Sequence, residues 1–232
     1  MVVKATLLPR QNVRLMWFKV ERTKFQTERK VEFMYNSEDT QQATINRSAQ
    51  FQYVFTDVPK PVPASQIVIF DKILGLPQAY GQTNGSVGSR LSTTWETESE
   101  LEIMDRLVSY TEGKESIKIE PPPPNMRQRL KEVEIRERED TVTRKITLKN
   151  LTEREMRDVQ LHLVENKEVR FDSTKTELFK KDPPEVIWKV EVPADGTASV
   201  EFSLKIQLMK VFEIEREPSK KERDLEKIRT PQ

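Results

Sequence analysis

The stretch EVIWKVEV-PADG-TASVEFSLKIQL, residues 185–208, decides the fold class. Apolar residues take every second position in both arms, with Val186, Trp188, Val190 and Val192 in the first and Val200, Phe202, Leu204, Ile206 and Leu208 in the second. A period of two is typical of strands that have one buried and one solvent face. Asp195-Gly196 offers the positive φ that a tight hairpin needs. We therefore expect two strands joined as a hairpin, with Trp188 in a hydrophobic core.

The same alternation recurs along the chain and predicts an all-β protein. Further strands are expected at residues 13–20, 30–35, 43–45, 51–55, 66–70, 133–150 and 158–165. Residues 91–119 fit a helix or a strand, and the β surroundings favour a strand. Short strands separated by polar turns are typical of β-sandwiches. We expect two β-sandwich, immunoglobulin-like units.

Four consecutive prolines, Pro121–Pro124, set the expected domain boundary. Such a run favours a polyproline II segment, which cannot join a sheet. The expected organisation is an N-terminal domain at 1–120, a Pro-rich linker at 121–126, a C-terminal β-sandwich at 127–216 and a charged tail at 217–232. Residues 27–38 and 142–153 share a basic pair, an alternating run and an Asn-containing turn. That echo fits either a duplication of one sandwich or the shared pattern of strand and turn.

Composition removes several classes of function. The 232 residues include 39 Lys and Arg and 38 Asp and Glu, so a net charge of +1 argues against nucleic acid as a partner. Without cysteine, and with His162 as its single histidine, the chain has no material for thiolate zinc or histidine-cluster sites. We expect no cofactor and no metal. No run approaches the roughly 20 apolar residues of a membrane span, and the N-terminal segment is unlike a signal peptide, so we expect a soluble chain whose compartment is open.

The sequence contains no specific motif for a catalytic site. His162 lies between Leu161 and Leu163, so alternation turns it away from the core, and no Gly-x-Ser-x-Gly motif presents a nucleophile. Glycines gather at residues 75–90, which predicts a long loop of the kind that is often functional or mobile. Abundant carboxylates leave a glycan hydrolase with a carboxylate pair as the alternative function, with this loop as its lid.

Aromatic residues supply the candidate binding site. Trp17 and Phe18 are adjacent on an expected strand, so they should face opposite ways, and we expect at least one of them to be exposed. Tyr80 and Trp95 flank the glycine-rich segment. Exposed aromatic rings stack on sugars and anchor protein partners. These four residues are the predicted ligand or partner site, with core packing as the competing interpretation.

One order of segments is similar to a known family. It runs from RKITLKN (144–150) through DVQLHLVE (158–165) to WKVEVPADGTASVEF (188–202). This order resembles the C-terminal region of the mucoidy inhibitor A-like family, a domain of unknown function with a β-sandwich end, and is similar to immunoglobulin-like modules. The resemblance implies a structural or interaction role and carries over no catalytic residue.

The sequence thus favours a non-catalytic interaction or structural module. Long alternating strands leave edges that can pair with a further strand. We expect a protein partner or a homo-oligomer formed through these exposed β-edges. A carboxylate pair converging in an apolar cleft would instead favour the hydrolase.

Overall fold

The computed structural model describes residues 24–70, 75–127 and 129–216, which fall in two compact units. Unit 1 takes in 1–28 and 51–96, and unit 2 takes in 29–50 and 97–232. The described chain is all-β, with two 3-10 turns, η1 (Asp39–Gln41) and η2 (Pro124–Met126). Within the described ranges, no helix has the length and apolar character needed to cross a bilayer.

The strands are long where the sequence alternates without a break. They are β1 (Lys24–Phe33), β2 (Thr44–Thr56), β3 (Ser65–Phe70), β4 (Pro77–Thr83), β5 (Ser86–Val87), β6 (Arg90–Ser92), β7 (Glu96–Thr111), β8 (Ser116–Glu120), β9 (Leu130–Asn150), β10 (Met156–Val164), β11 (Val169–Thr174), β12 (Lys180–Asp182), β13 (Glu185–Val192) and β14 (Thr197–Glu215). The segment at 91–119 is mostly strand, as the surroundings favoured, with connections at 93–95 and 112–115. The predicted strand at 13–20 lies outside the described residues.

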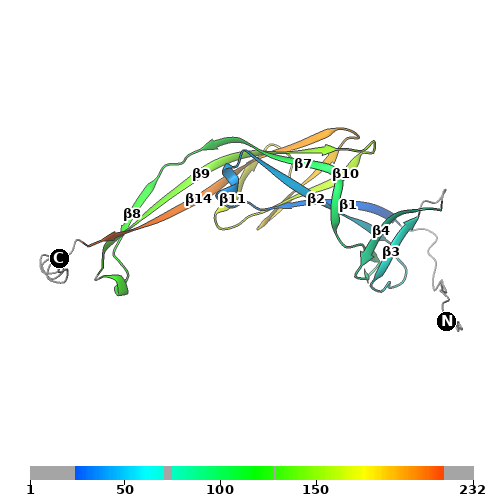
Figure 1. The fold of residues 1–232 in the computed structure, drawn as a ribbon, viewed down its shortest axis with the longest axis horizontal. Coiled ribbons are helices and arrows are strands. Elements are labelled where there is room, and N and C mark those ends of the chain that lie inside the picture. Colours follow the sequence, from blue (N-terminus) through cyan, green and yellow to red (C-terminus); the bar gives the residue numbers. More distant parts are fainter. Residues whose placement is uncertain (1–23, 71–74, 128, 217–232) are drawn as a thin grey trace, which may run out of the picture. The chain divides into compact units, whose positions relative to one another are not determined.

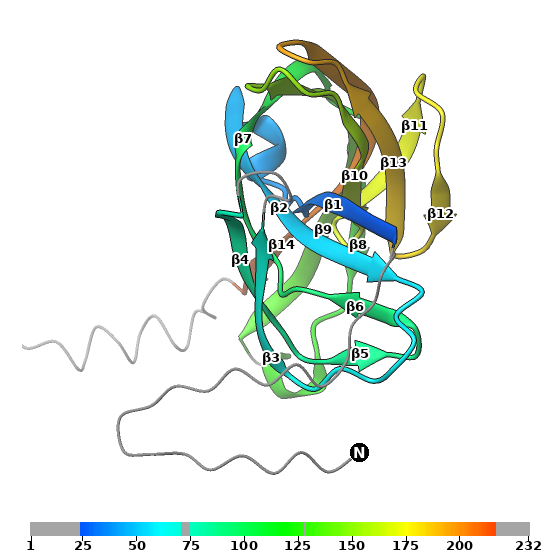
Figure 2. The same cartoon turned by 90° about the vertical axis from the view of Figure 1, so that its right-hand side faces the viewer.

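Unit 2 is a curled sheet wrapped around one core. The strand order is β11-β14-β9-β7-β2-β1-β10-β13-β12, and β1 pairs with β10 in parallel. Figure 2 shows β7, β9, β10 and β13 curving round the interior. Apolar side chains from both sides of the curl meet inside, as expected of a strongly twisted sheet that buries one face. The β14–β9 side therefore faces the β10–β13 side across the core.

Trp188 lies at the centre of that core, as predicted. Its side chain is fully buried and its ring packs against Phe202 and Phe171, with centroid separations of 5.3 and 5.8 Å. Its Nε1–H has no acceptor among the described residues. The buried positions of β14 are the alternating apolar ones, Val200, Phe202, Leu204 and Ile206. The predicted buried face of β14 is confirmed through Ile206. In β13 the prediction holds for Val186, Trp188 and Val192, but Ile187 on the opposite face is buried as well.

The predicted hairpin is wrong. β13 pairs with β10 and β12, whereas β14 pairs with β9 and β11, so the turn at 193–196 is a corner between the two sides of the curl. Asp195 supplies the positive φ, and its N–H donates to the carbonyl of Thr152. Asn150 fixes the corner, because its Nδ2 donates to the carbonyls of Pro193 and Arg154. The predicted turn at 193–196 is confirmed, but the two strands that it joins, β13 and β14, pair with different strands.

The expected linker does not separate the compact units. β7, before the prolines, pairs with β9, after them, from Leu101↔Asn150 to Thr111↔Thr141. The units instead part at residues 28, 50 and 96. The prolines occupy the connection between β8 and β9, two antiparallel neighbours of the same unit. Proline breaks a strand, but the chain can turn there and return to the same sheet.

The expected glycine-rich loop is mostly strand. β4, β5 and β6 lie within or overlap residues 75–90, and β4 pairs with β3 in a two-stranded sheet of unit 1. At Gly81 an added Cβ would lie 2.7 Å from Cγ2 of Thr93, so this glycine permits a close approach between segments. Gly85 has a φ of +102° in the turn before β5. Glycine here marks strand contacts and turns rather than a long lid.

Candidate functional site

The largest buried polar group in the core is Arg144 of β9. Its Nε donates to Asp105 Oδ1 at 2.7 Å, and its Nη1 donates to the carbonyls of Thr40 and Gln42 at 2.8 and 3.0 Å. Both Arg144 and Asp105 are fully buried. A buried charge pair is tolerated only when its remaining donors and acceptors are also satisfied. Arg144 therefore ties the η1 turn to the sheet.

The second oxygen of Asp105 is equally occupied. Asp105 Oδ2 accepts from Tyr35 Oη at 2.7 Å and from Arg47 Nη2 at 2.9 Å. The Arg47 guanidinium lies 4.7 Å from the Tyr35 ring centroid. Burial, followed by the Asp105 charge, raises the pKa of the Tyr35 hydroxyl, which stays protonated as a donor. We call these four residues (Arg144, Asp105, Tyr35 and Arg47) the Arg144 cluster. Its role is structural, because both oxygens of the Asp105 carboxylate are occupied by hydrogen bonds and none of its groups is free to act as a catalytic acid or base.

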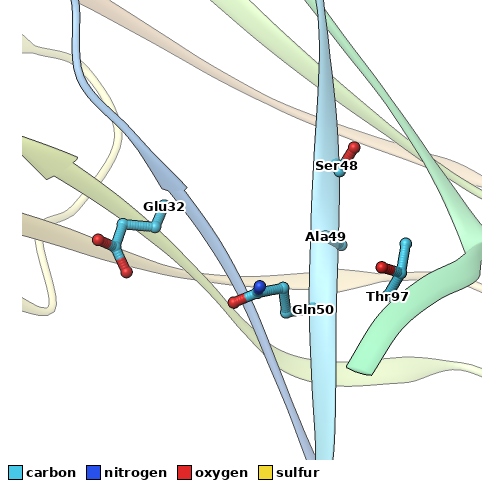
Figure 3. Close-up of a pocket in the computed structure, with 5 residues that line it drawn as sticks. All are labelled: Glu32, Ser48, Ala49, Gln50 and Thr97. Carbon is cyan, nitrogen blue, oxygen red and sulfur yellow. The ribbon is translucent and has the colours of Figure 1, made fainter. Parts of the chain in front are cut away.

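The surface hollow in Figure 3 does not bring two acids together. It has a volume of about 300 Å³ and is lined by Glu32, Ser48, Ala49, Gln50 and Thr97. Glu32 is its one carboxylate, and that group accepts a 3.0 Å hydrogen bond from Lys30. A glycosidase needs two carboxyl groups on opposite sides of the scissile bond. The hollow therefore offers no support for hydrolysis.

A second hollow, of about 380 Å³, does hold two acids, Glu137 and Glu139 of β9. Each is ion-paired: Glu137 accepts from Lys118 at 2.8 Å, and Glu139 accepts from Lys205 at 3.0 Å. These hydrogen bonds raise the pKa of both lysines, so the amines stay charged beside the carboxylates. Solvent-exposed ion pairs of this kind are surface features rather than a catalytic pair.

Beyond the core, β8, β9 and β14 form what we call the ribbon, residues 116–120, 130–139 and 207–215. β8 pairs with β9 from Ser116↔Glu137 to Glu120↔Val133, and β14 pairs with β9 throughout. Figure 1 shows this three-stranded ribbon continuing β9 and β14 away from β10. The described core cluster contains no residue of the ribbon except Leu208, which packs against its margin. Apart from Leu130, which is fully buried at the start of β9, the ribbon is therefore a single layer with solvent on both faces.

A hydrogen-bonded cluster of Asp140, Tyr110, Gly113 and Arg138, which we call the junction cluster, lies where the ribbon leaves the core. Asp140 is buried and accepts hydrogen bonds from the Tyr110 hydroxyl, the Gly113 N–H and the Arg138 guanidinium. Burial by itself would raise the pKa of Asp140, but these donors hold it below its ordinary value. Gly113 is required, because an added Cβ would overlap the carbonyl oxygen of Glu139.

Both outer edges of the ribbon lack a described neighbour, because β8 pairs only with β9, and the open β14 edge begins past Ile206. β11 covers β14 only from Phe202 to Ile206, and next to it the Gln207 N–H donates to the Glu168 carbonyl. Backbone groups alternate sides along a strand, so Met209, Val211 and Glu213 also point their N–H and C=O groups outward. The Arg216 N–H, at an even position, donates inward to Arg129, as this alternation requires. In the described part of the chain, no strand pairs with these outward groups.

Apolar side chains accompany that open edge. Met209, Val211 and Phe212 are 66, 54 and 43% exposed. Phe212 shares a face with Ile119, since both lie opposite Glu134. The Arg136 guanidinium lies 4.8 Å from the Phe212 ring centroid on this face. Exposed apolar residues gathered along an unpaired edge are typical of a surface that binds another chain.

None of the four predicted site residues is a described residue of the ribbon. Trp17 and Phe18 lie outside the described residues. Tyr80 is 58% exposed on β4, opposite Val68 of β3, and Trp95 is 37% exposed between β6 and β7. Both belong to unit 1, so neither lies on the ribbon, and their role in binding stays a prediction. Sequence reasoning missed the ribbon edge, although the apolar residues of the segment VFEI (211–214) are compatible with a strand there.

Comparisons of this chain with family models, with curated proteins and with solved structures find no match.

Proposed function

We propose that this chain is a non-catalytic interaction module that binds a protein strand along the open β14 edge of the ribbon. The observation that carries the proposal is that β14 continues past Ile206 with its outward backbone groups uncovered by any described strand. An added strand would satisfy these groups with main-chain hydrogen bonds, and its side chains would contact those of β14. Natural proteins generally block such an edge unless it is used.

Charged side chains along the β14 edge would also determine which strands can pair with it. Lys210 and Glu213 alternate with the apolar residues, and they point to opposite faces of the ribbon. Like charges placed directly opposite each other on paired strands are destabilising. A partner strand must therefore offer apolar or oppositely charged residues at matching positions.

The hydrolase alternative has no observation in its favour among the described residues. The acids of the two hollows are ion-paired, and Asp105 is locked in the core. A retaining or inverting mechanism needs one acid with a raised pKa beside a free carboxylate. The interaction module is the better-supported function.

We further propose that unit 2 has the immunoglobulin-like sandwich architecture that the mucoidy inhibitor A-like resemblance implies. Its support is the core cluster, in which Val200 and Phe202 of β14 meet Val186 and Trp188 of β13 across the interior. Aligned packing of two apolar sheet faces is the defining feature of a sandwich. A role in structure or interaction rather than catalysis agrees with this proposal.

A pair of proline variants tests edge binding. Val211→Pro removes an outward N–H and leaves the β9 pairing intact, so the variant should fold yet lose any strand bound at the edge. Lys210→Pro removes an inward N–H and should unpair the ribbon itself. Val211→Thr is the matched control that keeps the outward N–H. Circular dichroism reports folding, and amide hydrogen exchange reports whether Met209, Val211 and Glu213 become protected when a partner is bound.

The proposal predicts that partner protein is retained by the wild type and by Val211→Thr and released by Val211→Pro. It also predicts protection of the three outward amides in the bound state. A partner that binds the folded Val211→Pro variant with unchanged affinity would overturn edge binding.

A further inference from the structure

We infer that the strand added at the β14 edge is β14 of a second copy of this chain, paired antiparallel about Phe212. This inference rests on the proposed function and names its partner. The result would be a continuous sheet in the order β8-β9-β14-β14-β9-β8, with a two-fold axis through its centre. Two-fold pairing of identical edges is the simplest closed assembly, because each copy satisfies the other's edge.

The length of the open edge sets the register. Glu168 blocks the edge at Gln207, where the two backbones are already hydrogen-bonded, and β14 ends at Glu215. A two-fold axis perpendicular to a sheet keeps each side chain on its own face, so only residues of equal parity can lie opposite each other. Centring on Phe212 pairs Met209 with Glu215 and Val211 with Glu213. It uses the edge to its end and keeps clear of Glu168, whereas centring on Val211 would place Glu215 against Glu168.

The outward backbone groups fit this register. Met209, Val211, Glu213 and Glu215 would form the hydrogen-bonded pairs, because their N–H and C=O groups point outward. Phe212 would face Phe212 of the second copy as a non-hydrogen-bonded pair, the closer of the two antiparallel spacings. Aromatic pairs at such positions stabilise a sheet.

The side chains also agree with self-pairing. On the face that carries Phe212, Lys210 would lie opposite Ile214 and diagonal to Phe212 of the second copy, within reach of its ring. On the other face, Val211 would lie opposite Glu213. No two like charges are directly opposite in this register.

At each end of the paired β14 strands, opposite charges would lie close together. Arg216 of the second copy would lie opposite Leu208, beside Glu168, and both Glu168 and Arg216 are exposed in the single chain. Opposite charges at the margin of an interface favour correct docking and make association sensitive to salt. One strand pair with a few apolar contacts is a small interface, so we expect a weak dimer with a Kd on the order of micromolar.

Cysteine scanning tests the register directly, since the chain contains no native cysteine. Single variants Met209→Cys, Lys210→Cys, Val211→Cys and Phe212→Cys are oxidised at equal concentration. Directly opposite residues in a non-hydrogen-bonded pair lie about 4.5 Å apart at Cα, within disulfide range, whereas diagonal ones lie about 7–8 Å apart. Phe212→Cys should therefore cross-link to itself at least roughly tenfold faster than its neighbours.

Two controls accompany the scan. Ile119→Cys, on the exposed β8 edge, measures random collision and pairing through the other side of the ribbon. An equal mixture of Lys210→Cys and Ile214→Cys should form a mixed disulfide that neither variant forms alone. Light scattering after gel filtration of the cysteine-free wild type and of Val211→Pro should show a concentration-dependent dimer for the first and a monomer for the second.

The outcomes separate this inference from the proposed function. A wild type that stays monomeric at high micromolar concentration overturns self-pairing. If its outward amides are then protected by another protein, edge binding stands without the second copy, whereas protection by another segment of the same chain overturns the proposed function as well. A dimer that cross-links best through Val211→Cys or Ile119→Cys overturns the Phe212-centred register, and a dimer that Val211→Pro does not weaken overturns the β14 edge as the interface.

Discussion

The two halves of β9 and β14 share the same strands but not the same surroundings. Residues 140–150 of β9 bury alternate side chains, among them Val142, Ile146 and Leu148, against the far side of the curl. Residues 130–139 pair with the same neighbour strand, yet they have solvent on both faces beyond Leu130. The backbone pairing of β9 with β14 therefore continues where their side chains no longer pack in the core. The core half supplies stability, and the ribbon half leaves backbone and apolar groups for a partner.

The comparison is most strongly tested by deleting one large aromatic side chain from each half. Trp188→Ala leaves a cavity at the centre of the core and should lower the free energy of unfolding by about 3–5 kcal/mol. Phe212→Ala removes an exposed ring and should cost less than about 1 kcal/mol. Urea denaturation monitored by circular dichroism measures both. Equal losses would show that the ribbon packs against an apolar surface after all.

Arg144→Met should cost a similar amount, about 3–5 kcal/mol, because it leaves Asp105 buried with part of its charge unpaired and frees the η1 turn. Lys205→Met, which breaks an exposed ion pair in the same sheet, is the matched control and should change stability by less than about 1 kcal/mol. Thermal and chemical denaturation report both values. If the double variant Asp105→Asn/Arg144→Met were no more stable than the sum of its single changes predicts, the two side chains would not be coupled.

Gly113→Ala probes the border between the halves. The new methyl group would overlap the backbone of Glu139, so the connection from β7 to β8 must shift, at a cost of about 1–3 kcal/mol. The shift should appear as faster amide exchange at β8 and near Asp140 while the core amides stay protected. Gly88→Ala is a useful comparison, since it meets open space but has a positive φ. Unchanged exchange at β8 would contradict the junction described above.

The smallest expected effect is one of pH. The pKa of Asp140 is depressed in the folded chain, so its contribution to stability is present above the ordinary carboxyl pKa and is lost as pH falls through the folded value. The stability difference between wild type and Asp140→Asn should therefore be largest near neutrality and shrink below about pH 4. Denaturation curves from pH 7 to pH 3 measure it. A difference that grows toward acid would mean that burial outweighs the three donors.

Much of the secondary structure was predictable because it follows from local pattern. Alternation identified the two strands within residues 185–208 and placed Trp188 inside. The buried Arg144 cluster was not predictable, because Asp105 and Arg144 look like any exposed strand residues among many charges. Only the pairing of β7 with β9 brings them together, with Tyr35 arriving from the segment after β1 and Arg47 from β2.

The amino-acid sequence by itself determined which residues extend and which face of each strand is apolar, because a period of two is a local property of the chain. Only the tertiary structure decided which strands pair with each other. It separated β13 from β14 across the core and joined β7 to β9 past the prolines. It also left the outer edge of β14 beyond Ile206 without a described neighbour. Strand pairing depends on contacts between residues distant in sequence, and their competition is settled by burial of the whole core rather than by any single turn.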